Sequence, residues 1–373
     1  MKGYYIFAPV EEGAAGKFSG VEKKIRNFCN VISEKVDITL DVLPPYVQEK
    51  SRLKRIIKRW ALWTPVGHNW REYVDRYDDA DFLYIRKAQH DASFLYFVKT
   101  IRKKNPDIKI LYEMPTYPYE KEQNITLGNF PNVLKDRIFR IKLKKYIDRV
   151  VTFYNQETII GIPTICIMNG YNFSNMKKPT YTLGESINLI EVSTTAFWHG
   201  YDRLIEGLYL YYQNGGKVDF VFHMVGPFMK EHKDLVRKYR LEKHVIFYGK
   251  MAGNELNQIY DKCCIGVDVL GGHRKDYPVS SSLKSREYAE KGIPLITSSP
   301  VDYFPDDYKY QMLCPYDDSP INMEAVVKFY NTIFYDGNIY RVGKEIQETA
   351  KKLCDFHVTL QPIIDYLYGE TNK

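Results

Sequence analysis

The chain has 373 residues, of which 45% are hydrophobic and 15% aromatic, so it is long enough for two ordinary α/β domains that each bury a core. It contains no run of about 18 apolar residues, and its opening segment turns acidic where a signal peptide needs an apolar stretch, so we expect a cytoplasmic protein. The net charge of +7 is uneven, because residues 1–175 hold 29 Lys and Arg against 20 Asp and Glu, whereas residues 176–373 hold 24 against 26.

Short β-branched runs alternate with stretches of helical period along the whole chain, which is typical of βαβ units. The predicted strands are residues 4–9, 36–42, 82–86, 108–114, 149–154, 164–168, 187–193, 219–225, 245–248, 265–270, 294–297 and 311–314. This order predicts an α/β protein with two Rossmann-like, doubly wound domains that face a central cleft. A polar segment at 172–186 separates the predicted domains, 1–175 and 176–355, and residues 356–373 are expected to form a closing helix that packs back on the first domain.

The six cysteines are scattered, and none has the spacing of a zinc site, so we expect buried thiols in a reducing compartment. Asp79 and Asp81 resemble a metal-binding D-x-D pair, but they precede a predicted strand. Ligands of open parallel sheets gather at the carboxyl ends of strands, so this pair lies at the wrong edge. We expect no bound metal and no cofactor other than a substrate nucleotide.

Two segments of the first half, 52–63 and 137–149, interleave bases with apolar residues. One interpretation is a pair of surface helices with solvated bases. The other is contact with an anionic membrane surface, which favours bases beside interfacial Trp60 and Trp63, and so a peripheral location on the inner face of the membrane. Nucleic acid is not expected as a partner, because no helix-turn-helix, zinc-finger or aromatic RNA-binding pattern occurs.

Small hydroxyl residues lead into a predicted helix that ends at Gly292. Ser280, Ser281 and Ser282 are expected to cap this helix and to leave several backbone N–H groups free for an anion such as a diphosphate. Leu283 and Lys284, which follow them, are also expected to bind the donor. Glu287, one turn further along, is a candidate acceptor for ribose hydroxyls. The alternative is an ordinary capped helix.

The pattern Lys284-x-x-Glu287-Tyr-Ala-x-x-Gly292-x-Pro294 resembles the donor-site helix of glycosyltransferase family 4 and its GT-B relatives, in which the Glu holds the donor ribose. The family usually has a second acidic residue eight positions earlier, where this chain has Val279. That residue normally contacts the transferred sugar, so the identity of the sugar is left open.

A second likeness covers residues 190–205, which resemble the first strand, loop and helix of the family's donor domain. Relatives place an Arg and a Lys there to bind diphosphate, and Ser193, Thr194, Thr195 and His199 occupy those regions in this chain. The Trp198-His-Gly-x-Asp-Arg203 pattern resembles a branch of capsule and surface-polysaccharide transferases, and this resemblance implies that His199 donates to phosphate; a core histidine is the alternative.

The first half resembles the family less specifically. Gly20 follows the first predicted strand, like the glycine loop that approaches donor and acceptor in relatives, although glycines are common after first strands. Glu113 ends a predicted strand before a loop rich in Pro and Tyr, and the resemblance implies contact with the acceptor hydroxyl or with an oxocarbenium-like transition state. The alternative is a rigid surface loop.

The expected function is therefore transfer of a sugar from a nucleotide-sugar donor to a saccharide or lipid-linked acceptor in surface-polysaccharide biosynthesis, with retention and without metal. The alternative is an inactive nucleotide-sugar-binding or scaffolding protein. An oxidoreductase is disfavoured, because no G-x-G-x-x-G follows any predicted strand.

Overall fold

The computed structural model describes residues 1–9, 20–44, 51–117, 130–153, 155–174 and 176–369. The chain divides into two compact units. Unit 1 comprises Met1–Ile167 and Thr359–Lys373, and unit 2 comprises Met168–Val358.

Unit 1 contains a seven-stranded sheet in the order β2-β1-β3-β4-β5-β7-β6. All neighbouring strands are parallel except β6 and β7. The strands are β1 (Lys2–Phe7), β2 (Asp37–Val42), β3 (Phe82–Arg86), β4 (Lys109–Met114), β5 (Arg149–Thr152), β6 (Thr158–Ile159) and β7 (Ile162–Cys166). The chain reverses its direction of growth between β1 and β3, which is the arrangement that places ligands at the carboxyl ends of those strands.

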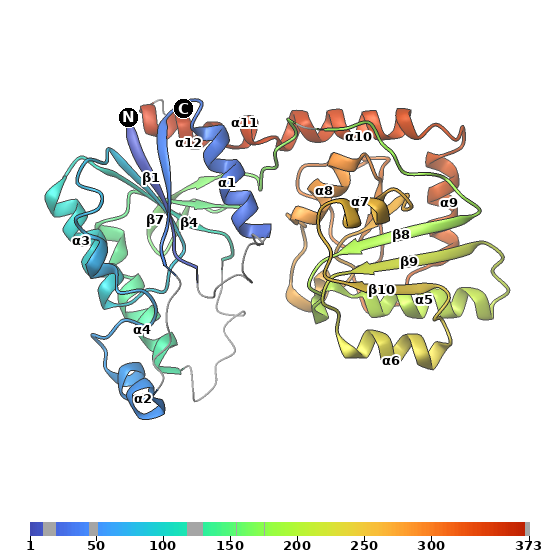
Figure 1. The fold of residues 1–373 in the computed structure, drawn as a ribbon, viewed down its shortest axis with the longest axis horizontal. Helices are drawn as coiled ribbons and strands as arrows, with labels where there is room; N and C mark the ends of the chain where they lie inside the picture. Colours follow the sequence, from blue (N-terminus) through green and yellow to red (C-terminus); the bar gives the residue numbers. More distant parts are fainter. Residues whose placement is uncertain (10–19, 45–50, 118–129, 154, 175, 370–373) are drawn as a thin grey trace. The chain divides into compact units, whose positions relative to one another are not determined.

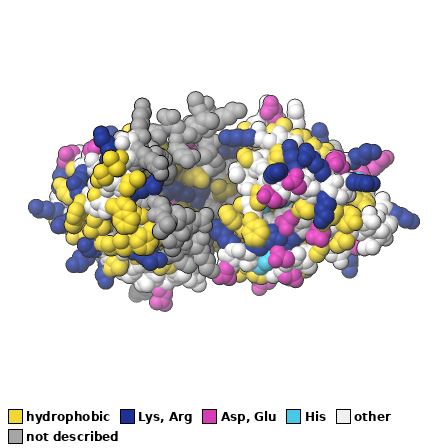
Figure 2. Space-filling view, turned by 90° about the horizontal axis from the view of Figure 1, so that it is seen from below, with side chains coloured by type: hydrophobic (Ala, Val, Ile, Leu, Met, Phe, Trp, Pro, Cys, Tyr) yellow, Lys and Arg dark blue, Asp and Glu magenta, His cyan; other side chains and the backbone are white. Residues whose placement is uncertain are grey.

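Helices cover both faces of this sheet. They are α1 (Gly20–Ile32), α2 (Arg52–Trp60), α3 (Ala92–Lys104), α4 (Phe130–Arg140) and α12 (Gln361–Tyr368), with 3-10 turns η1 (Trp70–Tyr73) and η3 (Leu143–Lys145). The helices α1 and α12 lie on one face, and α3 and α4 on the other (Figure 1). The helix α2 differs from these, because all its side chains that the structure describes are exposed, and hydrophobic side chains gather on this side of unit 1 (Figure 2).

Unit 2 contains a six-stranded parallel sheet in the order β10-β9-β8-β11-β12-β13. Its strands are β8 (Ser186–Val192), β9 (Asp219–Val225), β10 (Val245–Gly249), β11 (Ile265–Val267), β12 (Leu295–Thr297) and β13 (Gln311–Leu313). Its helices are α5 (Tyr201–Gln213), α6 (Lys230–Tyr239), α7 (Asn254–Tyr260), α8 (Leu283–Lys291), α9 (Met323–Ile333), α10 (Ile339–Cys354) and α11 (Phe356–Thr359), with 3-10 turns η4 (Phe197–His199) and η5 (Gly272–Lys275). The helices α5 and α6 lie on one face of the sheet, and α7 and α8 on the other (Figure 1).

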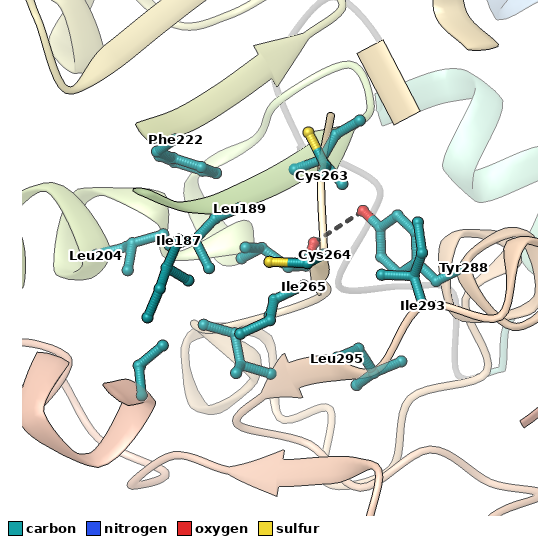
Figure 3. Packing of buried hydrophobic residues seen from close by; sticks show 14 of the residues in the cluster. Ile187, Leu189, Leu204, Phe222, Cys263, Cys264, Ile265, Tyr288, Ile293 and Leu295 are labelled. Atoms are coloured by element: carbon teal, nitrogen blue, oxygen red, sulfur yellow. Dashed lines mark hydrogen bonds between the residues drawn. The ribbon is translucent and has the colours of Figure 1, made fainter. Parts of the chain in front are cut away.

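The core of unit 2 holds its central strands in register. Leu189 of β8 and Ile265 of β11, which are fully buried, pair across the sheet, and Phe222 of β9 packs beside them (Figure 3). Burial of each such side chain contributes about 1.5–3 kcal/mol. The carboxyl ends of β8 and β11 are therefore fixed side by side.

Each predicted strand overlaps an observed one, which confirms the α/β prediction. The short strand β6 was not predicted. The expected closing helix is interrupted, because α11 ends at Thr359 and α12 begins at Gln361, where Pro362 occupies the first turn. The prediction that the cysteines are buried is wrong for Cys166, which is exposed because it follows buried Ile165 in the alternation of β7.

The segment Thr359–Lys373 belongs to unit 1 although it follows unit 2 in the chain. Lys109 Nζ of β4 donates to the carbonyl oxygens of Tyr366 and Leu367 at 3.1 and 2.6 Å. These carbonyls lie at the end of α12, where a cation also complements the helix dipole.

None of the helices in the described part of the chain has the length and apolar character required to cross a bilayer.

Candidate functional site

The sheet of unit 2 has a topological switch point between β8 and β11. From β8 the chain builds outward through β9 and β10, and it then crosses to β11, β12 and β13 on the other side. The loops after β8 and β11 therefore leave the sheet side by side at its carboxyl edge, which is where open α/β sheets bind ligands. The polar residues of the candidate site lie in these two loops and in the helices that follow them.

The loop after β8 is tied to the loop after β9. Ser193 N donates to Val225 O at 3.0 Å, and Thr195 N donates to Pro227 O at 2.8 Å. Thr195 Oγ1 accepts from Met229 N, so this buried hydroxyl holds the start of α6. A Cβ on Gly226 would lie 2.0 Å from Ser193 O, so the close contact requires glycine. Of the three residues expected to bind a donor here, Thr194 is exposed, whereas Ser193 and Thr195 organise the loop.

The loops after β8 and β11 also contact each other directly. Leu270 N donates to His199 O at 2.8 Å. Gly200, with φ of 69°, lies so close to Gly271 that a Cβ would be 2.4 Å from Gly271 N. This contact brings the start of α5 against the segment that leads to α8.

The start of α8 is built around a buried carboxylate, Asp268. Its two oxygens accept from Ser280 Oγ at 2.7 Å and from Ser282 Oγ at 2.8 Å. Ser282 is the N-cap, since its Oγ also accepts from Ser285 N at 3.1 Å. The expectation that all three serines cap the helix is wrong, because Ser280 Oγ donates to Asp268 and Ser281 Oγ donates to Asp302. The loop is thereby stiffened by carboxylates beneath it.

The first turn of α8 carries free donors at the carboxyl edge of the sheet. The N–H groups of Leu283 and Lys284 have no intrahelical acceptor, and none is present for them among the described residues. Lys284 Nζ donates to Tyr201 Oη at 2.8 Å and lies 3.4 Å from Asp268 Oδ1. Because Tyr201 is the first residue of α5, this contact joins the N-terminal ends of the two helices, and both helix dipoles favour an anion there.

A second buried carboxyl, Glu191, lies at the end of β8. Its Oε2 accepts from Ser193 Oγ at 2.7 Å, and its Oε1 has no partner among the described residues. Burial raises the pKa of Glu191 to about 7, although the charge of Lys284 lowers it. Near neutral pH this group therefore exists in both protonated and ionised forms, which is unusual for a carboxyl and typical of functional sites.

His199 is held as a neutral hydrogen-bond donor. Its Nδ1 lies 3.1 Å from Ala196 N, and since a backbone amide can only donate, Nδ1 accepts and the proton is on Nε2. Burial lowers the pKa of His199 to about 2, and the nearby positive charge of Lys284 adds to this effect. If His199 meets a phosphate, it does so through Nε2–H and not as a cation. Arg203, one turn further along in α5, is fully buried and donates to three backbone carbonyls, so its role is structural.

Glu287 lies one turn into α8 and is half-buried. Burial raises the pKa of Tyr171 and of Tyr260, and the negative charge of Glu287 raises both further. The site residues of unit 2 that the sequence predicts thus lie in the loops after β8 and β11 or in the start of α8. Val279, just before Ser280, is exposed.

The two predicted residues of unit 1 lie at the carboxyl side of its own sheet. Gly20 begins α1, and the loop before it, 10–19, lies outside the described residues. Glu113 is only 2% exposed and accepts from Tyr5 Oη at 2.7 Å and from Arg86 Nη1. Burial alone raises the pKa of Glu113, but the charges of Arg86 and Lys24 outweigh this and lower it overall. In the conformation described, Glu113 is thus a buried, ionised partner of Arg86, and most of the loop after it, 118–129, lies outside the described residues.

Glu191, Asp268 and Tyr201 were not predicted from the sequence. The first two are acidic residues within predicted apolar strands, where a carboxyl is costly unless it has a role, and this signal was present in the sequence. The part played by Tyr201 was not predictable, since it depends on the contact between two helix ends. No group of three or more His, Cys, Asp or Glu in the described residues is arranged to hold a metal ion.

No family model and no curated protein matches the chain, whereas solved structures do. HepE of Anabaena in complex with UDP-glucose is similar over 99% of this chain and 100% of its own, with a TM-score of 0.60 and 14% identity. Sucrose-phosphate synthase of Thermosynechococcus elongatus is similar over 100% of both chains, with a TM-score of 0.59 and 14% identity. An alpha-glucosyltransferase in complex with UDP and mismatched DNA is similar over 98% of this chain and 99% of its own, with a TM-score of 0.61 and 12% identity. At these identities the likeness shows the fold, which is the GT-B fold of two Rossmann-like domains.

Proposed function

We propose that the chain is a glycosyltransferase that binds the diphosphate of a nucleotide-sugar at the switch point between β8 and β11. The observation that carries this proposal is the joining of two helix N-termini by Lys284 and Tyr201, 2.8 Å apart, over a stiffened loop. Amides and a cation at one edge of the sheet suit an anion, and a diphosphate is long enough to reach both helix ends. Similar folds have been solved with UDP or UDP-glucose bound, so uridine diphosphate sugars are the first donors to test.

In this proposal the chain's own donors stabilise the leaving diphosphate. The N–H groups of Leu283 and Lys284 and the ammonium of Lys284 face the phosphates, and His199 adds a neutral Nε2–H. Such preorganised donors act on charge that develops as the bond to the sugar breaks, which is usually the largest contribution to catalysis. If Glu191 is protonated, it carries no negative charge that would repel the diphosphate. Glu287 accepts from the donor ribose.

The finer assignments rest on the resemblance to glycosyltransferase family 4. They are retention of configuration, catalysis without metal, a saccharide or lipid-linked acceptor bound on the side of Gly20 and Glu113, and a role in surface-polysaccharide biosynthesis. Val279 stands where the family's sugar-binding acid is usual, so we propose no particular sugar.

Thermal unfolding with UDP, GDP, ADP and CMP and their sugars tests the binding proposal, because any nucleotide that binds the folded state raises Tm. Glu287→Ala is expected to weaken binding of the preferred nucleotide-sugar and to leave the fold intact. Glu290→Ala, on the same helix, is the matched control and should leave Kd unchanged. If no nucleotide shifts Tm, or if the two variants behave alike, the switch point is not the donor site.

Turnover separates an enzyme from an inactive binding protein. Release of nucleotide from the preferred donor in the presence of acceptor extracts is expected for the wild type. His199→Ala should lower kcat with little change in Tm, and His199→Gln, which keeps a donor nitrogen near the position of Nε2, should retain more activity. Binding without turnover for any acceptor would favour the scaffolding alternative.

A further inference from the structure

The helix α2 has an uncovered apolar face. Leu53, Ile56, Ile57 and Trp60 are between 45% and 67% exposed, and Trp63 just beyond the helix is 67% exposed. With about 100° per residue, the four helical residues fall within an arc of about 100° on one side of the helix. Surface helices of globular proteins normally turn such a stripe toward the core, whereas this stripe is exposed, as on a surface that docks on a partner.

The opposite side of α2 is basic. Lys54, Lys58 and Arg59 are exposed, Arg52 and Arg55 belong to the same helix, and no acidic residue occurs between residues 50 and 63. The bases flank the apolar stripe, since Lys54 and Arg59 lie next to its two edges on the helical wheel. On the face of the molecule shown in Figure 2, Lys and Arg side chains accordingly border the hydrophobic side chains of unit 1.

The end of α2 is anchored although its face is open. Lys135 of α4 is 2% exposed, and its Nζ donates to Lys58 O at 3.0 Å, to Thr64 O at 3.0 Å and to Thr64 Oγ1 at 3.1 Å. Trp63 also contacts the ring of Phe139 of α4, with centroids 6.1 Å apart. A helix of nine residues is marginal by itself in water, and this anchor holds it in place with the apolar stripe outward.

We propose that this surface, formed by Leu53, Ile56, Ile57, Trp60 and Trp63 with Lys54, Lys58 and Arg59, docks unit 1 on an anionic lipid bilayer. Three features favour binding to such a bilayer. The apolar arc can enter the boundary of the acyl chains, the tryptophans lie at the depth of the headgroups, and the bases lie beside anionic headgroups. Nucleic acid would use the bases and leave the apolar stripe exposed to water. The surface goes beyond the transferase proposal, and its failure would leave donor binding at the switch point untouched.

The full chain can be tested by co-sedimentation with vesicles of phosphatidylcholine alone and of equal parts phosphatidylcholine and phosphatidylglycerol. Binding to the anionic vesicles only is expected, and it should be lost near 1 M salt, where the Debye length is about 3 Å. Each base near an anionic surface contributes about five-fold to partitioning, so the variant K54Q/K58Q/R59Q should bind about one hundred-fold more weakly. The variant K344Q/K351Q/K352Q removes the same charge from exposed positions of α10 and should bind like the wild type.

The apolar half of the proposal has its own variant pair. W60S/W63S should also weaken vesicle binding, whereas Y335S/Y340S, which removes two aromatic side chains that are 75% and 59% exposed in unit 2, should not. All ten substituted positions are exposed, so Tm should change little in every variant. Equal binding to both vesicle types, no binding at low salt, or equal loss in the two charge variants would overturn the proposal. Binding of duplex DNA that K54Q/K58Q/R59Q abolishes and W60S/W63S leaves unchanged, without vesicle binding, would assign the surface to nucleic acid instead.

Discussion

Glu191→Gln tests whether the carboxyl at the end of β8 carries an unusual proton. Glu191 is 1% exposed, and burial raises its pKa from 4.5 to about 7. The folded state therefore binds more protons than the unfolded state between these two values, so the free energy of unfolding falls as pH rises through this window. One pKa unit corresponds to 1.36 kcal/mol, so the ionised carboxylate lowers the free energy of unfolding by about 3 kcal/mol above about pH 8. Glutamine removes the ionisation and keeps an oxygen that can accept from Ser193 Oγ.

The assay is denaturant or thermal unfolding of the wild type and Glu191→Gln at several values between about pH 5 and about pH 8.5. Near pH 5 the two proteins should be similar, and with rising pH the variant should become more stable than the wild type by up to about 3 kcal/mol. Ser193→Ala removes a hydrogen bond to the carboxylate and should steepen the pH dependence. Parallel curves for the wild type and Glu191→Gln would refute the reasoning, because they would mean that Lys284 keeps Glu191 ionised in the folded state.

Ser282→Ala removes the N-cap of α8 and should lower the free energy of unfolding by about 1 kcal/mol. Ser282→Thr, which keeps a capping hydroxyl, should retain most of that stability. Equal losses of the two variants in chemical denaturation would contradict the capping role. Gly200→Ala should lower the free energy of unfolding several-fold more than Gly215→Ala. Gly215 is the control, because both residues have positive φ but no atom lies within 4 Å of a Cβ at Gly215. Similar Tm values for the two variants would exclude the steric explanation. Arg86→Met should destabilise unit 1 by about 3–5 kcal/mol, because it leaves Glu113 buried without its cation. Adding Glu113→Gln should restore much of the lost stability. Additive losses in the double variant would show that the ion pair does not couple Arg86 and Glu113.

The fold was predictable because apolar runs and turns recur in the order that βαβ units require. Strand β9 was predicted with its observed ends, and β8 within one residue, since buried parallel strands read as continuous apolar runs. Strand β6 was not predictable, because its two residues form a strand only through antiparallel pairing with β7. The break between α11 and α12 could have been expected from Pro362.

The candidate site was predictable only in part. Hydroxyls before α8 indicated a capped helix, but which serine caps it depends on Asp268 and Asp302, which reach the loop from elsewhere in unit 2. His199 was selected by resemblance, whereas its tautomer follows from one contact with Ala196 N. Glu113 was expected to be open to a substrate, and its pairing with Arg86 depends on the register of β3 and β4, which sequence patterns leave undefined.

The position of α12 has a consequence for the order in which the protein is made. Unit 1 needs a segment that follows unit 2 in the chain, since Lys109 donates to the last carbonyls of α12 and Tyr368 Oη donates to Lys35 O. All of unit 2 is therefore synthesised before α12, the last helix that packs on the sheet of unit 1. Until then the outer face of β4 and β7 beneath α12 stays uncovered in the nascent chain, so unit 2, which is continuous in sequence, is the part that can finish folding first.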